Sequence, residues 1–525
     1  MATPGTAVHE FESSLAGRPV GAAAVMALFA FAVSYFRSFV FPATPLVLWG
    51  DYVGFFNDGS RIAAGQLPYR DYFKVVTPGT DLIYALLIKT FGLRLWIPPL
   101  VMALLAAVVA LLITLIAAQV TRGKWVLLPA LMFMGFALIY SNDATHHWFS
   151  TIFVLAAVLV LLRGVTLRGV AIAGVCCGLA ACFTQTRGVL AVAGFAVYLL
   201  QKPEEGQDRA RRWKSAILLC ACAAAVFFVC NVYFIYAAGW RQWWFCLLEY
   251  PLRYYPAPAI NNWRVLTYEF ADQKARLKWL TFPVIYGMIP LSYAALVITG
   301  QRRGWNRGDE SSQRVLLVAI AGIALVLAVI SAPSVKRVSI SLAPALVLLA
   351  WVLAEWRGRL RLLRNGIGLC AIAMALLLPL RTQTQHYLYV AVPAGRAALS
   401  DAALADEYHW LAEHTHPGQY LFGLAPLYFT FHLRNPAPIE GYHGSEYTRP
   451  EQVAGLLRAV ESHDVPLIVL RWPYDPLNSS GGPSDHLGPF RSYLLSNYHV
   501  SKSFSTGDVV WERNLPFAPQ DVGTK

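Results

Sequence analysis

The run LWIPPLVMALLAAVVALLITLIAAQV, residues 95–120, contains no charged side chain. An α-helix needs about 20 apolar residues to cross about 30 Å of hydrocarbon, so this run predicts a transmembrane helix. Outward from it, the chain offers further apolar runs at 20–41, 125–141, 147–163, 169–184, 188–200, 215–239, 279–299, 315–332, 338–356 and 365–381. The sequence therefore predicts an α-helical polytopic membrane protein with about 11 transmembrane helices.

The first of these runs, residues 20–41, does not have the form of a cleavable signal peptide. It is long enough to span a bilayer, and no A-x-A-like cleavage site closes it. We therefore expect it to remain as the first transmembrane helix. The runs 169–184 and 188–200 are short, so we expect tilted or partly re-entrant helices there.

Charge divides the chain into two parts. It is 14% charged, whereas a soluble globular protein carries about 25%. Residues 1–394 hold 34 basic and 16 acidic side chains, and residues 395–525 hold 9 and 14. We predict a transmembrane domain over 1–394 and a small α/β soluble domain over 395–525. The basic side chains lie in short runs between apolar stretches and not on one face, which argues against nucleic acid as a partner.

The C-terminal part alternates between helix and strand patterns. Helices are predicted over 399–415, 449–463 and 491–498, strands over 466–471 and 508–513, and a Gly- and Ser-rich loop over 478–485. This alternation is typical of a small α/β domain.

The distribution of Lys and Arg predicts the orientation in the membrane. With a cytoplasmic N-terminus, the inner loops hold 17 basic residues in 49 positions and the outer loops 14 in 107. Cytoplasmic loops are enriched in Lys and Arg, which favours this orientation. An odd number of helices then makes the C-terminal domain periplasmic in a bacterial-type inner membrane. Two outer loops, 42–94 and 240–278, are long, and the Trp, Tyr and Arg residues of the second suit contact with membrane lipid headgroups.

The first outer loop carries the most informative stretch, WGDYVGFFNDGSRIAAGQLPYRDYFKVVTPGTDLIYALLIKTFG, residues 49–92. Asp51 follows the first predicted helix closely, and a short amphipathic run leads from it to Gly65. Acidic residues avoid the predicted helices and collect on the predicted outer side: Asp51, Asp58, Asp71, Asp81 and Asp143. This placement suits chemistry at the membrane surface better than an ion pathway through the bilayer.

The stretch resembles the first outer loop of the GT-C superfamily of polyprenyl-phosphate-sugar-dependent glycosyltransferases, which includes protein O-mannosyltransferases and lipid A aminoarabinose transferases. The family pattern is an acid pair, a helix A-R-x-x-x-x-G, then P-Y-x-D and P-P-G. Asp51 matches the first acid, Arg61 falls near the helix arginine, and TPG (77–79) replaces P-P-G. Tyr52 stands where the second acid is expected, so no role carries over to that position.

Three further segments resemble the same family, in the same order. They are SNDATHHWFS (141–150), which puts Asp143 at the outer end of a helix, GLAACFTQTRGVLAVAG (178–194), which contains Arg187, and SVKRVSISLAPALVLLAW (334–351), a basic loop before a helix. Together the motifs cover most of residues 45–355. The resemblance implies a GT-C-like fold, a polyprenyl-phosphate-linked sugar donor and an inverting transfer without a metal or another cofactor.

Such a transfer asks for two kinds of side chain at the outer face. A carboxylate must accept the proton of the acceptor hydroxyl, and cations must stabilise the leaving phosphate. We predict Asp51 and Asp143 as catalytic acids, with Asp51 the general base, and Arg61, Asp71, Arg187, Lys336 and Arg337 as substrate-binding residues. The structural alternatives are helix caps for Asp51 and Asp143, a turn for Asp71, a solvated helix face for Arg61 and headgroup contacts for the other three cations.

Other interpretations stay open at this stage. Asp143 and His146 have the spacing for a divalent ion, although a polar loop end is the simpler expectation. Glu249, Tyr250 and Arg253 can line the second outer loop near substrate. A transporter or flippase of lipid-linked glycans would need ionisable residues within the helices and repeat symmetry, which the sequence lacks. A non-catalytic assembly protein is the other alternative, and the donor sugar and the acceptor class (glycan, lipid or protein) are not identified.

Overall fold

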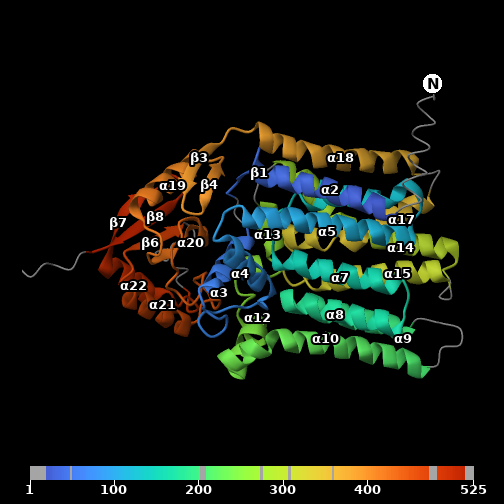
Figure 1. Cartoon of the computed structure of the whole chain (residues 1–525), viewed down its shortest axis with the longest axis horizontal. Helices are drawn as coiled ribbons and strands as arrows, with labels where there is room; N and C mark the ends of the chain where they lie inside the picture. Colours follow the sequence, from blue (N-terminus) through green and yellow to red (C-terminus); the bar gives the residue numbers. More distant parts are fainter. Residues whose placement is uncertain are drawn as a thin grey trace, which may run out of the picture.

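The computed structural model describes residues 19–47, 50–201, 209–271, 276–305, 309–356, 360–471 and 482–514. Long helices lie side by side in a bundle, and most strands gather at one end of it (Figure 1). The bundle contains α2 (Pro19–Ser38), α5 (Ile97–Val120), α6 (Leu128–Met132), α7 (His146–Leu162), α8 (Leu167–Phe183), α9 (Gln185–Gln201), α10 (Arg209–Ala238), α14 (Arg276–Arg303), α15 (Glu310–Leu327), α17 (Ala343–Glu355) and α18 (Arg361–Thr384). Each lies at a predicted position, which confirms the α-helical polytopic architecture.

Six helices in the described ranges are long and apolar enough to cross a membrane: α2, α5, α10, the part of α14 from Val284, α15 and α18. Other apolar helices are shorter, such as α7 and α8 with 17 residues each. Around α6 the helix changes form, with 3-10 turns in η1 (Gly123–Val126) and a π-helix in η2 (Phe133–Ala137). The chain is an integral multi-pass membrane protein, and the number of 11 spans stays a prediction.

The first long loop folds into two packed helices, α3 (Tyr52–Ala63) and α4 (Gly79–Phe91). α3 is amphipathic and buries Val53, Phe55 and Phe56. The two helices cross at Gly59, where an added Cβ would lie 2.6 Å from the Cβ of Tyr84. This close approach holds α3, and the residue before it, in a fixed place at the end of the bundle.

The second long loop contains α11 (Trp240–Trp244), η3 (Phe245–Glu249), α12 (Tyr250–Arg253), η4 (Ala259–Asn261) and α13 (Val265–Ala271). Trp240 and Trp244 are exposed, whereas Trp243 and Tyr250 are buried. Exposed tryptophans at the end of a helix bundle suit a membrane–water interface.

The C-terminal region, residues 388–514, combines strands and helices. A hairpin of β3 (Leu388–Val392) and β4 (Gly395–Leu399) lies across the predicted boundary at 394, and the division into domains at that residue stays a prediction. A sheet follows in the order β5-β6-β8-β7, with β5 (Leu421–Gly423) parallel to β6 (Leu467–Arg471) and β8 (Asp508–Arg513) antiparallel to β6 and to β7 (Tyr498–Ser503). Its helices are α19 (Ala402–His414), α20 (Ala425–Thr430), α21 (Pro450–Ser462) and α22 (Gly488–Asn497).

The predicted helices and strands of this region are confirmed, and part of the predicted loop 478–485 lies outside the described residues. The helix predicted from 399 begins at Ala402, because 399 still pairs in β4 and the Asp401 side chain caps the helix by accepting from Ala403 N (3.0 Å). The short strands β3, β4, β5 and β7 were not predicted, since three to six residues carry little periodicity.

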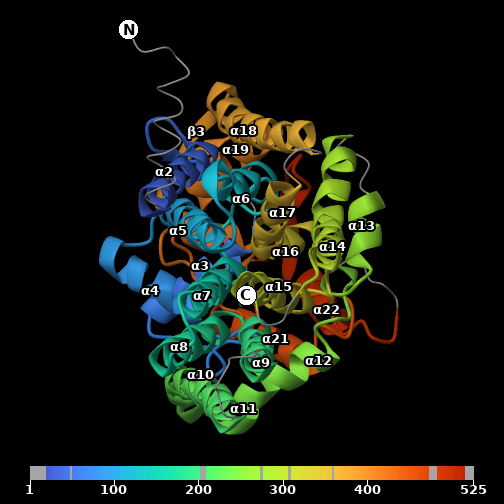
Figure 2. The same cartoon turned by 90° about the vertical axis from the view of Figure 1, so that its right-hand side faces the viewer.

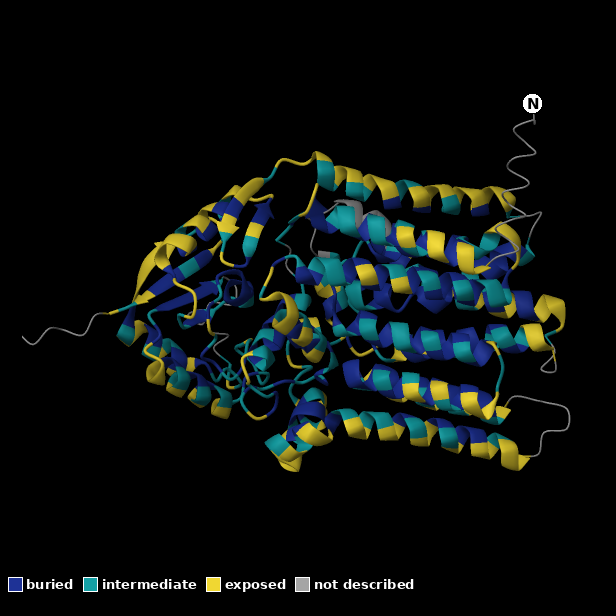
Figure 3. Cartoon of the chain, in the orientation of Figure 1, coloured by how far each residue is buried: buried dark blue, intermediate teal, exposed yellow. Residues whose placement is uncertain are grey.

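The C-terminal region packs against the two long loops at the end of the bundle opposite the start of α2 (Figures 1 and 2). Val47 N donates to Ala398 O (3.1 Å), and Phe73 N donates to Pro438 O (2.7 Å). Buried residues concentrate in the middle of the bundle and along these contacts, whereas α10 and α18 carry many exposed ones (Figure 3). The sequence-distant parts therefore form one surface at this end.

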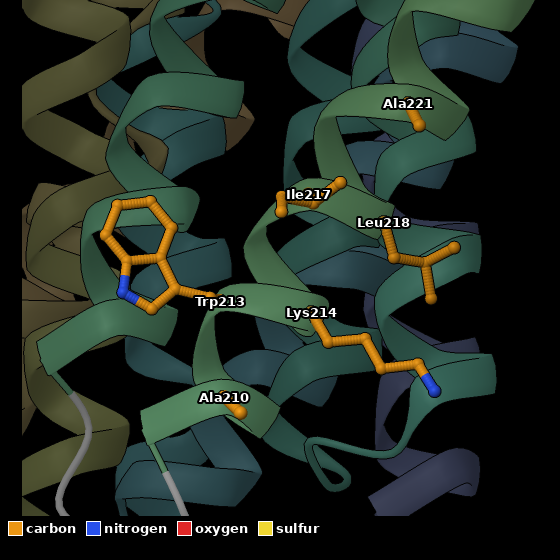
Figure 4. Close-up of a pocket in the computed structure, with 6 residues that line it drawn as sticks. All are labelled: Ala210, Trp213, Lys214, Ile217, Leu218 and Ala221. Carbon is orange, nitrogen blue, oxygen red and sulfur yellow. The ribbon is translucent and has the colours of Figure 1, made fainter.

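Helix α10, at one edge of the bundle, presents an apolar outer surface. Its side chains Ile217, Phe228 and Val229 are exposed. A shallow hollow near its start is lined by Ala210, Trp213, Lys214, Ile217, Leu218 and Ala221 (Figure 4). Trp and Lys beside apolar side chains are typical of the headgroup layer, with the apolar face turned to the hydrocarbon.

Candidate active site

Asp51 stands directly before α3, where the long loops and the C-terminal region meet. Its backbone N–H donates to Asp143 Oδ2 (3.1 Å). Its side chain makes no hydrogen bond to the start of α3, so the helix-cap alternative for Asp51 is wrong. The side chain is 53% exposed. The carboxylate is therefore accessible and has no structural task in the helix.

Two predicted acids and one predicted cation meet in one cluster. Lys336 Nζ lies 3.3 Å from Asp51 Oδ2 and 2.5 Å from Asp143 Oδ2. The side chains of Lys336 and Asp143 are 23% and 10% exposed. We call Asp51, Asp143 and Lys336 the open cluster, because its outermost carboxylate remains half accessible.

Local structure fixes the lysine of the open cluster. Lys336 lies in the short helix α16 (Val335–Ile340), whose first turn is capped by the Ser334 side chain, which accepts from Arg337 N (3.3 Å). Ser141 Oγ donates to Lys336 O (2.9 Å), which ties this helix to the segment that carries Asp143. The sequence signal for this arrangement was the basic loop at 334–337.

A glycine makes room for the buried acid. A Cβ added at Gly50 would lie 2.8 Å from Asp143 Oδ2. Only a residue without a side chain lets the backbone before Asp51 approach the Asp143 carboxylate this closely. The contact sets the spacing between the two acids.

The two acids of the open cluster have opposite pKa shifts. Burial would raise the pKa of Asp51, but the charges of Lys336 and Arg337 outweigh it and the pKa is lowered. Burial raises the pKa of Asp143, and the Asp51 charge adds to the rise, although Lys336 opposes it. For Lys336, burial lowers the pKa, but the two carboxylates outweigh burial and raise it. Asp51 is thus ionised, and Lys336 is charged, at neutral pH.

Arg337 and Arg187 lie next to each other through Ser341. The Arg337 guanidinium donates to Tyr255 Oη (3.2 Å) and to Ala332 O (3.2 Å), and remains partly exposed. Arg187 is fully buried, and its Nη2 donates to Ser341 Oγ (3.1 Å), whose hydroxyl donates to Arg337 O (3.0 Å). The headgroup-contact alternative does not fit Arg187, because it is enclosed by protein.

Asp143 and His146 have different partners. His146 Nδ1 lies 3.0 Å from Thr184 Oγ1, and its ring packs against Phe55 at 4.9 Å between centroids. Asp143 instead binds Lys336. Within the described ranges, no three His, Cys, Asp or Glu side chains are placed to share a metal ion.

A second cluster, which the sequence did not predict as a unit, lies farther along α3. Lys74 Nζ is 2.5 Å from Asp58 Oδ2 and 2.8 Å from Asp81 Oδ1. All three side chains are at most 7% exposed, and we call them the closed cluster. Burial raises the pKa of Asp81 to about 8, with Lys74 opposing the rise.

The C-terminal region adds an acid beside the closed cluster. Asn57 Nδ2 donates to Glu440 Oε1, and burial together with the Asp58 charge raises the pKa of Glu440. A lone lysine in the apolar run YFKVV, residues 72–76, was a usable signal, because a buried charge needs a partner. Glu440 offered no signal, since it is far away in the sequence.

Arg61 and Asp71 do not join the open cluster. Arg61 is buried, donates to Gln66 Oε1 (2.7 Å) and to Ala437 O (3.0 Å), and stacks over the ring of Tyr72. The solvated-face alternative for Arg61 is therefore wrong. Asp71 pairs with Arg70 (2.7 Å) and accepts from Leu67 N (2.7 Å), which closes a turn.

The second outer loop contributes aromatic contacts. Tyr250 is buried and its hydroxyl donates to Tyr447 O in the C-terminal region. Glu249 and Arg253 instead pair with each other (2.6 Å), with Arg253 largely exposed. The second outer loop therefore contacts the C-terminal region through Tyr250 and not through this ion pair.

The fold is shared with solved membrane glycosyltransferases. ArnT from Cupriavidus metallidurans bound to undecaprenyl phosphate matches with a TM-score of 0.56 at 14% identity, over 94% of this chain and 98% of that chain. The apo state of ArnT gives 0.54 at 15% identity, over 93% and 97%. The archaeal oligosaccharyltransferase AglB from Archaeoglobus fulgidus, in complex with an inhibitory peptide and a dolichol-phosphate, gives 0.53 at 12% identity, over 96% and 75%.

No protein-family model and no curated protein sequence matches the chain. At these identities the structural likeness concerns the fold. It confirms the predicted GT-C-like fold for the whole polytopic chain.

Proposed function

We propose that this chain is a membrane glycosyltransferase that moves a sugar from a polyprenyl-phosphate donor to an acceptor hydroxyl at the outer face of the membrane. The open cluster carries the proposal, because it holds an accessible ionised carboxylate beside a lysine and an arginine. Support comes from ArnT and AglB, which share the fold and were solved with undecaprenyl phosphate and a dolichol-phosphate.

In the proposed reaction, Asp51 accepts the proton of the acceptor hydroxyl. The hydroxyl oxygen attacks the anomeric carbon of the donor sugar, and the bond from that carbon to the phosphate oxygen breaks on the opposite side. The sugar is transferred with inversion, and polyprenyl phosphate leaves. Because its pKa is lowered, Asp51 is in the ionised form that a base needs at neutral pH.

Negative charge grows on the leaving phosphate, and preorganised cations stabilise it. We assign this task to Lys336 and Arg337, which are both partly exposed. Asp143 holds Lys336 at 2.5 Å and acts as a positioning residue. The Arg187 guanidinium donates hydrogen bonds to neutral groups of the bundle, His147 O and Ser341 Oγ. We therefore assign Arg187 to positioning Ser341, whose hydroxyl donates to Arg337 O.

Binding of the donor lipid tests the proposal with the purified full-length protein in nanodiscs. Undecaprenyl phosphate is expected to bind, and Arg337→Gln is expected to weaken binding about tenfold or more, since a charge-assisted contact is lost. Arg264→Gln, an exposed arginine of the same outer loops, is the matched control. Unchanged binding in Arg337→Gln, or equal losses in both variants, would contradict the assignment.

Turnover is measured with a panel of polyprenyl-phosphate sugars that carry a labelled sugar. The protein is expected to transfer the label of one donor to material in a membrane extract, or to release it slowly to water without an acceptor. Failure with every donor, together with absent binding of undecaprenyl phosphate, would refute the function.

The outer-face orientation has its own test. Cysteines are introduced at exposed Ser400 in the C-terminal region and at exposed Arg302 at the other end of the bundle, in a cysteine-free background. A membrane-impermeant maleimide added to intact cells is expected to label the variant at 400 and to spare the variant at 302. The reverse pattern would place the site on the cytoplasmic side.

A further inference from the structure

A groove of about 950 Å³ lies apart from the open cluster, between the first outer loop, the second outer loop and α21. Its walls include Arg61, Tyr72, Phe73, Tyr254, Arg449 and Arg458. Its size is at the upper end of the usual range of ligand pockets, about 300–1,000 Å³. Its lining contains both guanidinium groups and aromatic rings, which suits a ligand with both apolar faces and negative charge.

Four arginines (Arg61, Arg70, Arg449 and Arg458) and two acids (Asp71 and Glu451) line the groove, so its net positive charge favours an anion. Arg458 is exposed on α21, and none of the described acidic residues pairs with it. Arg449 stacks on the ring of Tyr254, with 4.4 Å from its guanidinium carbon to the ring centroid, and pairs with Glu446 (2.5 Å). A flat guanidinium on an aromatic face presents its N–H edge sideways, where carboxylate or phosphate oxygens can accept two hydrogen bonds.

Unsatisfied polar atoms also line the groove. The hydroxyl of Tyr72 and Nε2 of Gln452 are buried and have no hydrogen-bond partner among the described residues. Tyr72 as a whole is 2% exposed. An unpaired buried polar group is unfavourable, so a small rotation of either side chain toward a hydroxyl or carboxylate oxygen of a ligand would gain a missing hydrogen bond.

The groove is linked to the open cluster through adjacent residues. Tyr254 lines the groove, and its neighbour Tyr255 accepts from Arg337 Nη2 (3.2 Å). Arg61 lies ten positions after Asp51 along α3, which corresponds to about 15 Å at 1.5 Å per residue. A ligand that occupies the groove and also reaches Asp51 must therefore be extended.

We propose that this groove binds the acceptor, and that the acceptor is an anionic glycan whose sugars carry carboxylate or phosphate groups. The role of the bound glycan as acceptor rests on the proposed glycosyltransferase function, whereas the binding of an anionic glycan does not. The lining residues come from helices and loops and include no strand, so the groove offers no sheet edge to which an extended peptide could pair.

The experiment measures binding of defined probes to the full-length protein in nanodiscs by calorimetry. The probes are a galacturonic acid hexamer, a neutral hexasaccharide with one phosphomonoester, neutral maltohexaose and hexaglutamate. Both acidic sugars, or one of them, are expected to bind at least tenfold more tightly than maltohexaose. The preferred probe tells carboxylate from phosphate. Equal binding of maltohexaose, or tighter binding of hexaglutamate, would overturn the proposal.

Two variants locate the binding. Arg458→Glu is expected to weaken binding of the acidic sugar at least fivefold, whereas Arg434→Glu, an exposed arginine of the same region outside the groove, leaves it unchanged. Ala459→Trp fills the groove from α21 and is expected to abolish binding. Unchanged binding in both groove variants would refute the site.

The two proposals fail separately. Undecaprenyl phosphate binding is expected to be the same in Arg458→Glu and in the unmodified protein, because Arg458 is not part of the open cluster. Loss of glycan binding with intact lipid-phosphate binding would refute only the proposal that the groove binds the acceptor. Absent lipid-phosphate binding with intact glycan binding would refute the glycosyltransferase function, and the groove would remain a glycan-binding site.

Discussion

The open and closed clusters contain the same groups, two aspartates around one lysine, but differ in access to solvent. In the open cluster, Lys336 joins Asp51 and Asp143 at 3.3 and 2.5 Å, and Asp51 is 53% exposed. In the closed cluster, Lys74 joins Asp58 and Asp81 at 2.5 and 2.8 Å, and no side chain exceeds 7%. The residue types and the Lys–Asp distances alone would not distinguish the two clusters.

The difference assigns different tasks to the two clusters. A buried ion pair cannot reach a substrate, and its removal leaves an uncompensated charge inside the protein. Lys74 also lies 4.4 Å over the ring of Phe55, which packs against His146 beside the open cluster. The closed cluster therefore holds α3 in place, and we assign the proposed chemistry to the open cluster before α3.

The largest effect is expected from the base. Asp51→Asn removes the proton acceptor and is expected to lower sugar transfer by about 10²–10⁴-fold, the usual contribution of a general base. Its melting temperature in detergent should stay close to that of the unmodified protein. Asp58→Asn in the closed cluster is the comparison, and its main effect should be a lower melting temperature. Near-normal transfer by Asp51→Asn would refute the assignment of the base.

Replacing each lysine in turn tests how much each cluster contributes to the stability of the protein. Lys74→Met leaves Asp58 buried without its cation and is expected to cost about 3–5 kcal/mol. Lys336→Met is expected to cost less, because the exposed Asp51 is solvated without it, and Asp143, whose pKa is already raised by burial, can take up a proton. Thermal unfolding of both purified variants checks this order. Equal losses would mean that the open cluster is also a structural element.

A single methyl group tests the spacing within the open cluster. In Gly50→Ala the new Cβ would lie 2.8 Å from Asp143 Oδ2, so the carboxylate and Lys336 must shift. Transfer is expected to fall about tenfold, in line with the loss of productive geometry. Gly441→Ala, where a Cβ meets nothing within 4 Å, should keep full activity. The same rate in both variants would show that the spacing of the acids is not critical.

The sequence predicted much of the fold because the signals were local. Long apolar runs such as 95–120 located the bundle helices, and the amphipathic run after Asp51 became α3. The short strands β5 and β7 and the hairpin at 388–399 were missed, because their pairing partners decide them.

The candidate site was predicted in part, for the same reason. Asp51, Asp143, Lys336 and Arg337 were named from loop position and resemblance, and the structure brings them together. Arg61 and Asp71 belong to the neighbouring groove, which forms only when the C-terminal region packs on the loop. The partners of Lys74, and the approach of Glu440, depend on tertiary packing that no local pattern encodes.

The smallest expected effect concerns the pH profile. The pKa is lowered for Asp51 in the open cluster, whereas it is raised for Asp81 in the closed cluster. Asp51 must be ionised to act as a base, so kcat/KM falls as pH drops through its pKa, which lies below the usual Asp value of about 3.9. Lys336→Gln removes a cation that lowers this pKa, while burial, which raises it, remains. The acid limb of the profile is therefore expected to move to higher pH. Arg264→Gln, at an exposed position of the second outer loop, should leave the limb in place. If Lys336→Gln lowers the rate equally at every pH, the lysine acts on the phosphate alone, and Asp51 does not depend on it for its charge.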